Sequence, residues 1–138
     1  MRNEWRRAAI DGNTAAFERL LEKGQAVDSR DRFGQTPLML AAVHGRKAVV
    51  DLLLAHDADL DVTAKYGLSA LMLAIVNGHT GIALALIEAG ADTTLQGTGA
   101  PGFAGRTASD LAQERGFASV VEAIARRGPT DDRSSRRG

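Results

Sequence analysis

Residues 34–45 read GQTPLMLAAVHG, and residues 67–78 read GLSALMLAIVNG. The two stretches share most of their residues and begin 33 positions apart. A third copy, GRTASDLAQERG, begins at Gly105, 38 positions after Gly67, so it follows a five-residue insertion. A period of this length is typical of stacked supersecondary units, in which each unit contacts only its neighbours.

The repeat divides almost the whole 138-residue chain. One period before Gly34 lies Met1, and the segment AAIDG at residues 8–12 then falls in register. We therefore expect one repeat domain over residues 1–128 and a disordered polar tail over residues 129–138. The expected repeats are residues 1–33, 34–66, 67–104 with the insertion, and 105–128.

Each unit carries the signals of a short first helix. One repeat position holds residues whose side chains accept a hydrogen bond at a helix N-terminus: Asn3, Thr36, Ser69 and Thr107. Pro37 follows at the first helical position, where its missing N–H costs nothing. Nine residues beyond the cap stand four glycines: Gly12, Gly45, Gly78 and Gly116. This spacing predicts a helix of about two turns that ends in a left-handed residue.

A second, broadly apolar segment follows each of these glycines. The stretch AVVDLLL at residues 48–54 is an example, and it predicts a helix packed on two sides. This second helix is expected to end at Gly24, Asp57, Gly90 and Gly128. The short polar stretch that leads to the next unit suits a hairpin-like turn. The fold class predicted from these patterns is all-α, a solenoid of stacked helix–turn–helix units.

The repeat resembles the ankyrin repeat family. Its signature Thr-Pro-Leu-His-x-Ala is similar to Thr36-Pro37-Leu38-Met39-Leu40-Ala41, and its Gly-Ala-Asp hairpin is similar to Gly90-Ala91-Asp92. The resemblance implies an ankyrin-repeat solenoid with hairpin-like turns on one side and a concave face that binds proteins. The departures are Met39 and Met72 in place of His, Asp57 in place of the hairpin Gly, and Asp28, Asp61 and Thr94 in place of the usual Asn.

Composition excludes several classes of function. The chain has 17 Lys and Arg against 17 Asp and Glu, whereas nucleic-acid-binding modules usually show a basic excess. It has no cysteine, which excludes disulfides and thiolate chemistry. No apolar run approaches the roughly 20 residues of a membrane span, and no signal-peptide pattern follows the charged N-terminus. We expect a cytoplasmic monomer that binds a protein, and neither nucleic acid nor membrane.

Three local patterns could suggest other chemistry. Residues 97–102 satisfy G-x-G-x-x-G, but they follow a predicted helix and a hairpin instead of a strand, so we expect a loop. Residues 57–61 begin like a calcium loop, but Val62 and Leu68 stand where glycine and glutamate are required. The three histidines occupy different repeat positions. We therefore expect no catalytic residues, no cofactor and no metal, and an enzyme or metal-binding protein is the disfavoured alternative.

The remaining candidate site is a protein-binding surface. The family resemblance implies that partners contact the turns and the ends of the first helices. Phe33 and Tyr66 occupy the same position in successive units, each preceded by a cation, and aromatics and arginine are enriched at interface hot spots. The expected partner-binding residues are Arg30, Arg32, Phe33, Gln35, His44, Lys65, Tyr66, Leu68, Asn77, Phe103, Arg106 and Arg115.

Two interpretations of these residues stay open. In the first, stacking aligns the aromatic and basic side chains as rows that bind an acidic or extended segment of a partner. In the second, each aromatic packs over the next hairpin and each cation is solvated. A binding module and a regulator or inhibitor of one specific enzyme or toxin are both consistent with a chain without attached catalytic sequence.

The insertion around Gly97–Pro101 also carries an expectation. Because lengthening a loop costs only about 0.6 kcal/mol per doubling, we expect a mobile, elongated tip whose deletion leaves stability nearly unchanged.

Overall fold

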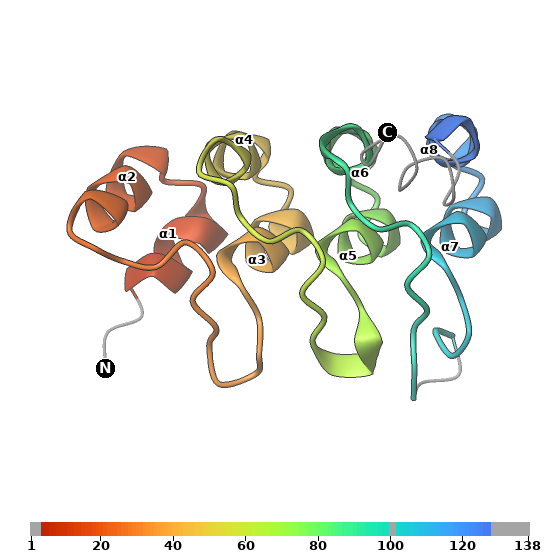
Figure 1. The fold of residues 1–138 in the computed structure, drawn as a ribbon, viewed down its shortest axis with the longest axis horizontal. Coiled ribbons are helices and arrows are strands. Elements are labelled where there is room, and N and C mark those ends of the chain that lie inside the picture. The colour runs from red at the N-terminus through yellow and green to blue at the C-terminus, as the bar shows by residue number, and fades with distance from the viewer. Residues whose placement is uncertain (1–3, 100–101, 128–138) are drawn as a thin grey trace, which may run out of the picture.

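The computed structural model describes residues 4–99 and 102–127, and these contain eight α-helices in four stacked pairs (Figure 1). The pairs are α1 (Glu4–Asp11) with α2 (Thr14–Glu22), α3 (Pro37–His44) with α4 (Lys47–Ala55), α5 (Ala70–Val76) with α6 (Thr80–Ala89), and α7 (Ala108–Glu114) with α8 (Ala118–Arg127). The all-α expectation is confirmed. The expected cap Asn3, the expected helix end Gly128 and the expected tail over residues 129–138 lie outside the described residues.

The helices form two rows. Helices α1, α3, α5 and α7 make the inner row, and α2, α4, α6 and α8 make the outer row (Figure 1). Three loops connect one pair with the next and project to the side away from the outer row. We call them tip 1 (residues 23–36), tip 2 (residues 56–69) and tip 3 (residues 90–107). A single 3₁₀ turn, η1 (Lys65–Gly67), lies in tip 2.

The predicted caps begin the inner helices. The Thr36 hydroxyl accepts a hydrogen bond from the Met39 amide at 3.2 Å, and the Ser69 hydroxyl accepts one from the Met72 amide at 3.3 Å. Thr107 and Asp110 form a reciprocal capping box at the start of α7. Thr36 and Ser69 are buried, so these bonds also satisfy hydroxyls that have left water.

The predicted glycines end the inner helices. Gly12, Gly45, Gly78 and Gly116 have φ values of 77°, 73°, 79° and 75°. At Gly45 the neighbouring unit also excludes a side chain, because a Cβ there would lie 2.7 Å from Cε1 of His79. These left-handed residues turn the chain back, so that the outer helix packs on the inner helix of the same unit.

Small residues allow the inner helices to approach one another. Ala8, Ala41, Ala74 and Ala112 share one repeat position, and all four are buried. The outer helices contribute larger buried side chains, among them Leu53, Leu86 and Ile124, again at one repeat position. The core is therefore a continuous layer between the two rows, built from the same contacts in successive units.

Polar bonds also link neighbouring units. Arg46 donates from Nε to the Ile10 carbonyl at 2.7 Å, and His79, at the same repeat position, contacts the Val43 carbonyl through Nε2 at 3.1 Å. Phe117 occupies this position in the last unit and cannot make the bond. This bond therefore links the first unit to the second and the second to the third, whereas Phe117 supplies none between the third and the fourth.

Carboxylates stand where the family usually has Asn, and they also bridge units. Asp28 accepts a hydrogen bond from the Asp59 amide at 3.0 Å, and Asp61 accepts one from the Asp92 amide at 2.8 Å. A backbone N–H needs only an acceptor, which a carboxylate supplies as well as an amide oxygen does. This departure from the family pattern is therefore compatible with the stacking of the units.

Asp57 has the left-handed backbone that its repeat position predicts, with φ of 60°. Its side chain is exposed, and the equivalent residues Gly24 and Gly90 have φ of 100° and 103°. A residue with a Cβ is strained in this region, so Asp57→Gly should raise the free energy of unfolding by roughly 0.5–1 kcal/mol. Urea unfolding measures this, with Asp57→Ala, which keeps the strain, as the matched control. A clearly less stable glycine variant would contradict the argument.

Candidate functional site

The tips expose the large aromatic side chains. Phe33 in tip 1 is 59% exposed, and Tyr66 in tip 2 is 38% exposed; they are the exposed large hydrophobic residues of the described chain. The Arg32 guanidinium carbon lies 5.3 Å from the centroid of the Phe33 ring, and Lys65 Nζ lies 5.0 Å from that of Tyr66. Each tip therefore presents a cation stacked on an exposed ring.

Tyr66 differs from Phe33 in its backbone and in its neighbours. Its φ is 63°, a left-handed conformation that a bulky residue rarely adopts. Its carbonyl accepts a hydrogen bond from the Thr98 amide at 2.7 Å, and its ring lies 5.8 Å from that of Phe103 at an interplanar angle of 38°. Tip 3 thus contacts Tyr66 through both backbone and side chain.

The insertion makes backbone contacts that the repeat pattern does not predict. Its neck is closed by two backbone bonds of 2.9 Å, from the Gly97 amide to the Arg106 carbonyl and from the Gly105 amide to the Gly97 carbonyl. Gly97 is buried. The described part of the insertion therefore packs against tip 2, while its mobility and the effect of its deletion on stability stay predictions. Ala100 and Pro101 lie outside the described residues.

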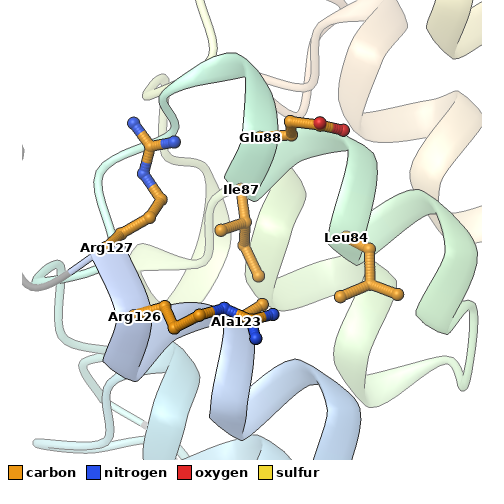
Figure 2. A pocket seen from close by; sticks show the side chains of 6 residues that line it. All are labelled: Leu84, Ile87, Glu88, Ala123, Arg126 and Arg127. Atoms are coloured by element: carbon orange, nitrogen blue, oxygen red, sulfur yellow. The ribbon is translucent and has the colours of Figure 1, made fainter.

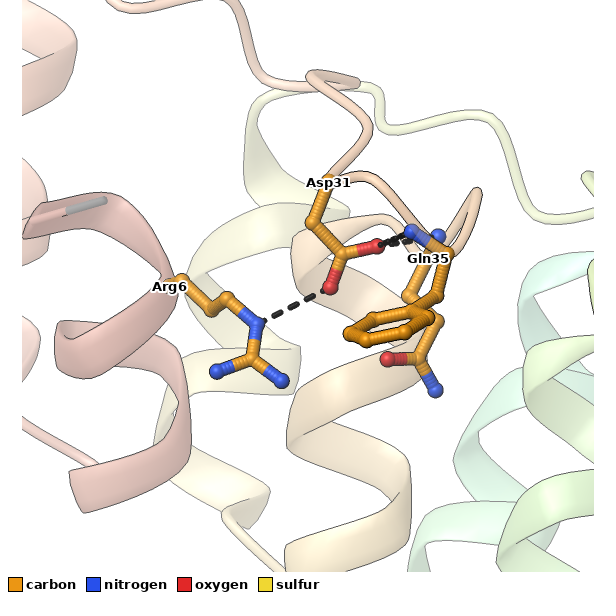
Figure 3. A network of polar contacts seen from close by, with 4 residues as sticks. Arg6, Asp31 and Gln35 are labelled. Atoms are coloured by element: carbon orange, nitrogen blue, oxygen red, sulfur yellow. Dashed lines mark hydrogen bonds and ion pairs between the residues drawn. The ribbon is translucent and has the colours of Figure 1, made fainter. Parts of the chain in front are cut away.

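Tip 1 is held instead by a buried carboxylate. Figure 3 shows Asp31 between Arg6 and the backbone near Gln35. Asp31 accepts from Arg6 Nε at 2.9 Å through one oxygen, and from the amides of Phe33 and Gln35, both at 2.9 Å, through the other. Its side chain is 2% exposed. The Asp31–Arg6 pair therefore ties the tip to α1.

The same bonds shift the titration of Asp31. Desolvation by burial raises the pKa of its carboxyl, but the hydrogen bonds from the Gln35 amide, the Arg6 side chain and the Phe33 amide outweigh it, and the pKa is lowered. Sequence reasoning missed this residue. The signal in the sequence was the position of Asp31, two and four residues before Phe33 and Gln35. At this spacing an Asp side chain often accepts hydrogen bonds from the backbone amides of a turn.

The other expected residues of tip 1 have structural partners. Arg30 donates from Nε to the Gly34 carbonyl at 3.0 Å and from Nη2 to the Thr63 carbonyl at 2.9 Å, so it joins tip 1 to tip 2. Gln35 is half-buried, and its backbone pairs with Asp31. Arg30 and Gln35 therefore shape the surface on which Arg32 and Phe33 are exposed.

The position of Leu68 differs from the one expected. It was expected to contact a partner, but it is only 5% exposed and packs in the core. Its repeat position is that of Gln35, and the apolar side chain turns inward where the polar one stays half-exposed. The sequence difference between Leu68 and Gln35 was itself the signal for burial.

The ends of the inner helices stay exposed. His44 ends α3, and Asn77 and Arg115 follow α5 and α7. The side-chain amide of Asn77 donates from Nδ2 to the Leu73 carbonyl at 2.8 Å, which caps the helix. In tip 3, Arg106 pairs with Glu114 at 2.6 Å, so its charge is partly neutralised.

The aromatic side chains of neighbouring tips differ in their contacts. Aligned rows and packing over the next hairpin were the two interpretations left open by the sequence. In the described part of the chain the ring pair is Tyr66 with Phe103, and Phe33 contacts the cation of Arg32. The structure thus brings together one aromatic pair across tips 2 and 3 and leaves Phe33 separate.

The comparison with known families identifies this architecture. A family model described as "Ankyrin repeats (3 copies)" matches residues 5–97. The chain belongs to the ankyrin repeat family. The match covers the first three helix pairs of the array, and α7 and α8 continue it beyond the matched range. No curated protein matches the chain.

The outer row of the ankyrin array has a groove of its own. It lies between α6 and α8, has a volume of about 330 Å³, and is lined by Leu84, Ile87, Glu88, Ala123, Arg126 and Arg127 (Figure 2). Leu84 occupies the repeat position that holds Glu18, Asp51 and Glu122 elsewhere. A second groove, of about 370 Å³, lies between Glu18, Leu21, Glu22, Gln25, Val27 and His56. The first groove is lined by helices α6 and α8 alone, whereas the second also includes Gln25 and Val27 of tip 1 and His56 of tip 2.

Other chemistry finds little support in the ankyrin array. Residues 4–99 and 102–127 contain no group of three His, Cys, Asp or Glu side chains that could hold a metal ion. His79 contacts the Val43 carbonyl of helix α3 through Nε2. Ankyrin repeat domains are typically non-catalytic, and the family model that matches this chain describes no catalytic domain. No helix of the described residues is long and apolar enough to cross a membrane.

Asp31→Asn tests the carboxylate that holds tip 1. Removing the charge weakens hydrogen bonds worth roughly 1–3 kcal/mol, so the variant should be less stable at pH 7. Because the folded-state pKa is lowered, this contribution is present above the unfolded value of about 3.9 and is lost as the pH falls through the folded-state pKa.

The stability difference between the wild type and Asp31→Asn should therefore shrink as the pH is lowered from about 5 toward 2. Urea unfolding at several pH values measures it. Asp11→Asn, an exposed acid at the end of α1, is the control. A difference that stays constant over this pH range would contradict the assignment.

Proposed function

We propose that the tips and the adjoining ends of the inner helices bind a partner protein, and that the partner presents an acidic or extended segment. Ankyrin repeats are generally protein-interaction modules. The observation that carries the proposal is the cation over an exposed aromatic ring in both tip 1 and tip 2. Exposed aromatics beside cations are the residue types enriched at interface hot spots.

Charge favours an acidic partner. The ion pairs of the described residues join Arg6 to Asp31, Lys47 to Asp51, Arg106 to Glu114, and Arg126 to Glu122. Arg32 and Lys65 form no such pair within the described chain, so their charges are available to a partner. The aromatic rings then act as apolar anchors, while the cations chiefly speed association.

The neighbouring residues have supporting roles in this proposal. Arg30 fixes the spacing of tips 1 and 2, and His44, Asn77 and Arg115 form the polar rim along the inner helices. Such a module has no catalytic step of its own. It acts by holding or occupying its partner, so regulation or inhibition of one enzyme or toxin is one outcome of the same binding.

The double change Phe33→Ala and Tyr66→Ala tests the anchors. Truncating a true anchor typically costs about 2 kcal/mol or more, so affinity for the isolated partner should fall at least about 30-fold. Titration calorimetry measures the affinity, and the thermal melt followed by circular dichroism should keep its helical transition. The control is Leu84→Ala in the outer groove. Unchanged affinity in the aromatic variant, with a loss in the control, would place the site on the outer row.

The double change Arg32→Ala and Lys65→Ala tests the role of charge. Exposed rim cations steer encounter more than they hold the complex, so the association rate should fall and become less sensitive to salt. Stopped-flow mixing at several ionic strengths measures both quantities. Lys47→Ala, on the outer row, is the matched control. An association rate that keeps its full salt dependence would exclude these cations from steering.

A further inference from the structure

We propose that the insertion makes tips 2 and 3 into one braced surface, formed by Lys65, Tyr66 and Phe103, and that this surface anchors an extended segment with the pattern acidic–x–aliphatic. We call it the tip 2–3 platform. The inference rests on the proposed function, because it names the principal anchor and the partner class of that binding surface. It also assigns a role to a segment that the repeat pattern treats as dispensable.

The first argument is the brace between the two tips. The neck bonds of Gly97 with Arg106 and Gly105 fold the insertion back, and this places the Thr98 amide against the Tyr66 carbonyl at 2.7 Å. The Phe103 ring then lies 5.8 Å from the ring of Tyr66. Backbone and side chain of one residue in tip 2 are thus fixed by two different residues of tip 3.

Glycines lie at the contact between the two tips and in the neck of tip 3. A Cβ on Gly67 would lie 3.2 Å from the Thr98 side chain, and one on Gly99 would lie 3.4 Å from Cδ1 of Tyr66. A Cβ on Gly97 would overlap the Phe103 carbonyl oxygen. By contrast, a Cβ on Gly102 would meet no atom within 4 Å. Gly67 therefore allows the close contact of tip 2 with Thr98, and Gly97 allows the narrow neck within tip 3.

The brace holds Tyr66 in a costly conformation. Tyr66 has φ of 63°, and a bulky residue keeps a left-handed conformation only where its surroundings determine it. Because the ring is already fixed before binding, less side-chain freedom is lost when a partner arrives. Phe33 has the Arg32 cation over its ring, but no second aromatic ring of the described residues pairs with it.

The groups of the platform define the partner's chemistry. Lys65 supplies a cation without an ion-pair partner in the described chain, and the Tyr66 hydroxyl makes no hydrogen bond within it, so both can donate to a carboxylate. Phe103 offers an apolar ring, while the nearby Arg106 is already paired with Glu114. The platform thus combines a carboxylate site with an adjoining apolar site.

The separation of the two rings is close to the spacing of side chains on one face of an extended chain. Side chains i and i+2 of an extended segment lie on one face, about 6.6–6.8 Å apart. The two ring centroids are 5.8 Å apart. We therefore assign the acidic residue of the partner to Lys65 and Tyr66, and an aliphatic residue two positions away to the Phe103 ring.

The brace is tested on the protein alone by amide hydrogen exchange of Thr98. The wild type should protect this amide, and Gly97→Ala should speed its exchange at least about tenfold, because the added Cβ displaces Phe103 and opens the neck. Gly102→Ala is the matched control and should leave it protected. An unprotected Thr98 amide in the wild type, or unchanged protection in Gly97→Ala, would overturn the brace whatever the partner.

The partner class is tested with a phage-displayed library of random 12-residue peptides selected on the full chain. Enriched peptides are then synthesised with a fluorescent label, and their affinities are measured by anisotropy. Acidic–x–aliphatic sequences should be enriched. Their affinity should fall at least about tenfold with Phe103→Ala and with Gly97→Ala, and should stay within about twofold with Gly102→Ala.

The variants separate the two levels of inference. If Phe33→Ala abolishes binding of acidic peptides while Phe103→Ala leaves it intact, the proposed function stands and the platform is wrong. If selection enriches no peptides, or peptides whose binding ignores all tip variants, recognition of a segment at the tips fails as well. Retained thermal melts in Phe103→Ala exclude loss of folding as the cause of a weaker affinity.

Discussion

The structure depends on the apolar face that each helix pair buries against the next. One pair of two-turn helices is too short to be stable alone, so the array exists only because Ala8, Ala41, Ala74 and Ala112 let successive inner helices meet. Left-handed glycines and hydroxyl caps set the lengths of these helices, and the lengths set where each tip leaves the core. The exposed surface of the tips is a consequence of this buried layer.

The sequence predicted the parts of the fold that repeat. Thr36, Ser69 and Gly45 follow local rules, and a fixed period repeats those rules from unit to unit, so caps, helix ends and pair order were all accessible. The departures lie where contacts are not local. Asp31 and Arg6 are 25 residues apart, and no periodic pattern connects them.

The candidate site shows the same division. The exposure of Phe33 and Tyr66 could be inferred from their shared repeat position, but their different environments could not. The insertion breaks the period, so alignment places Phe103 at the position of Lys65 while folding places it against Tyr66. Leu68 was misassigned because repeat position was given more weight than its apolar side chain.

Two strained residues illustrate how strain relates to function in this array. Asp57 and Tyr66 have nearly the same φ, 60° and 63°. Asp57 stands at a helix end where equivalent units use glycine, and its exposed side chain gains nothing visible from the conformation. Tyr66 has a hydrogen bond to its carbonyl, a ring partner and a stacked cation, all supplied by residues of the tips. Strain that neighbouring groups hold in place is the kind that fixes an exposed anchor, whereas strain without such support only lowers stability.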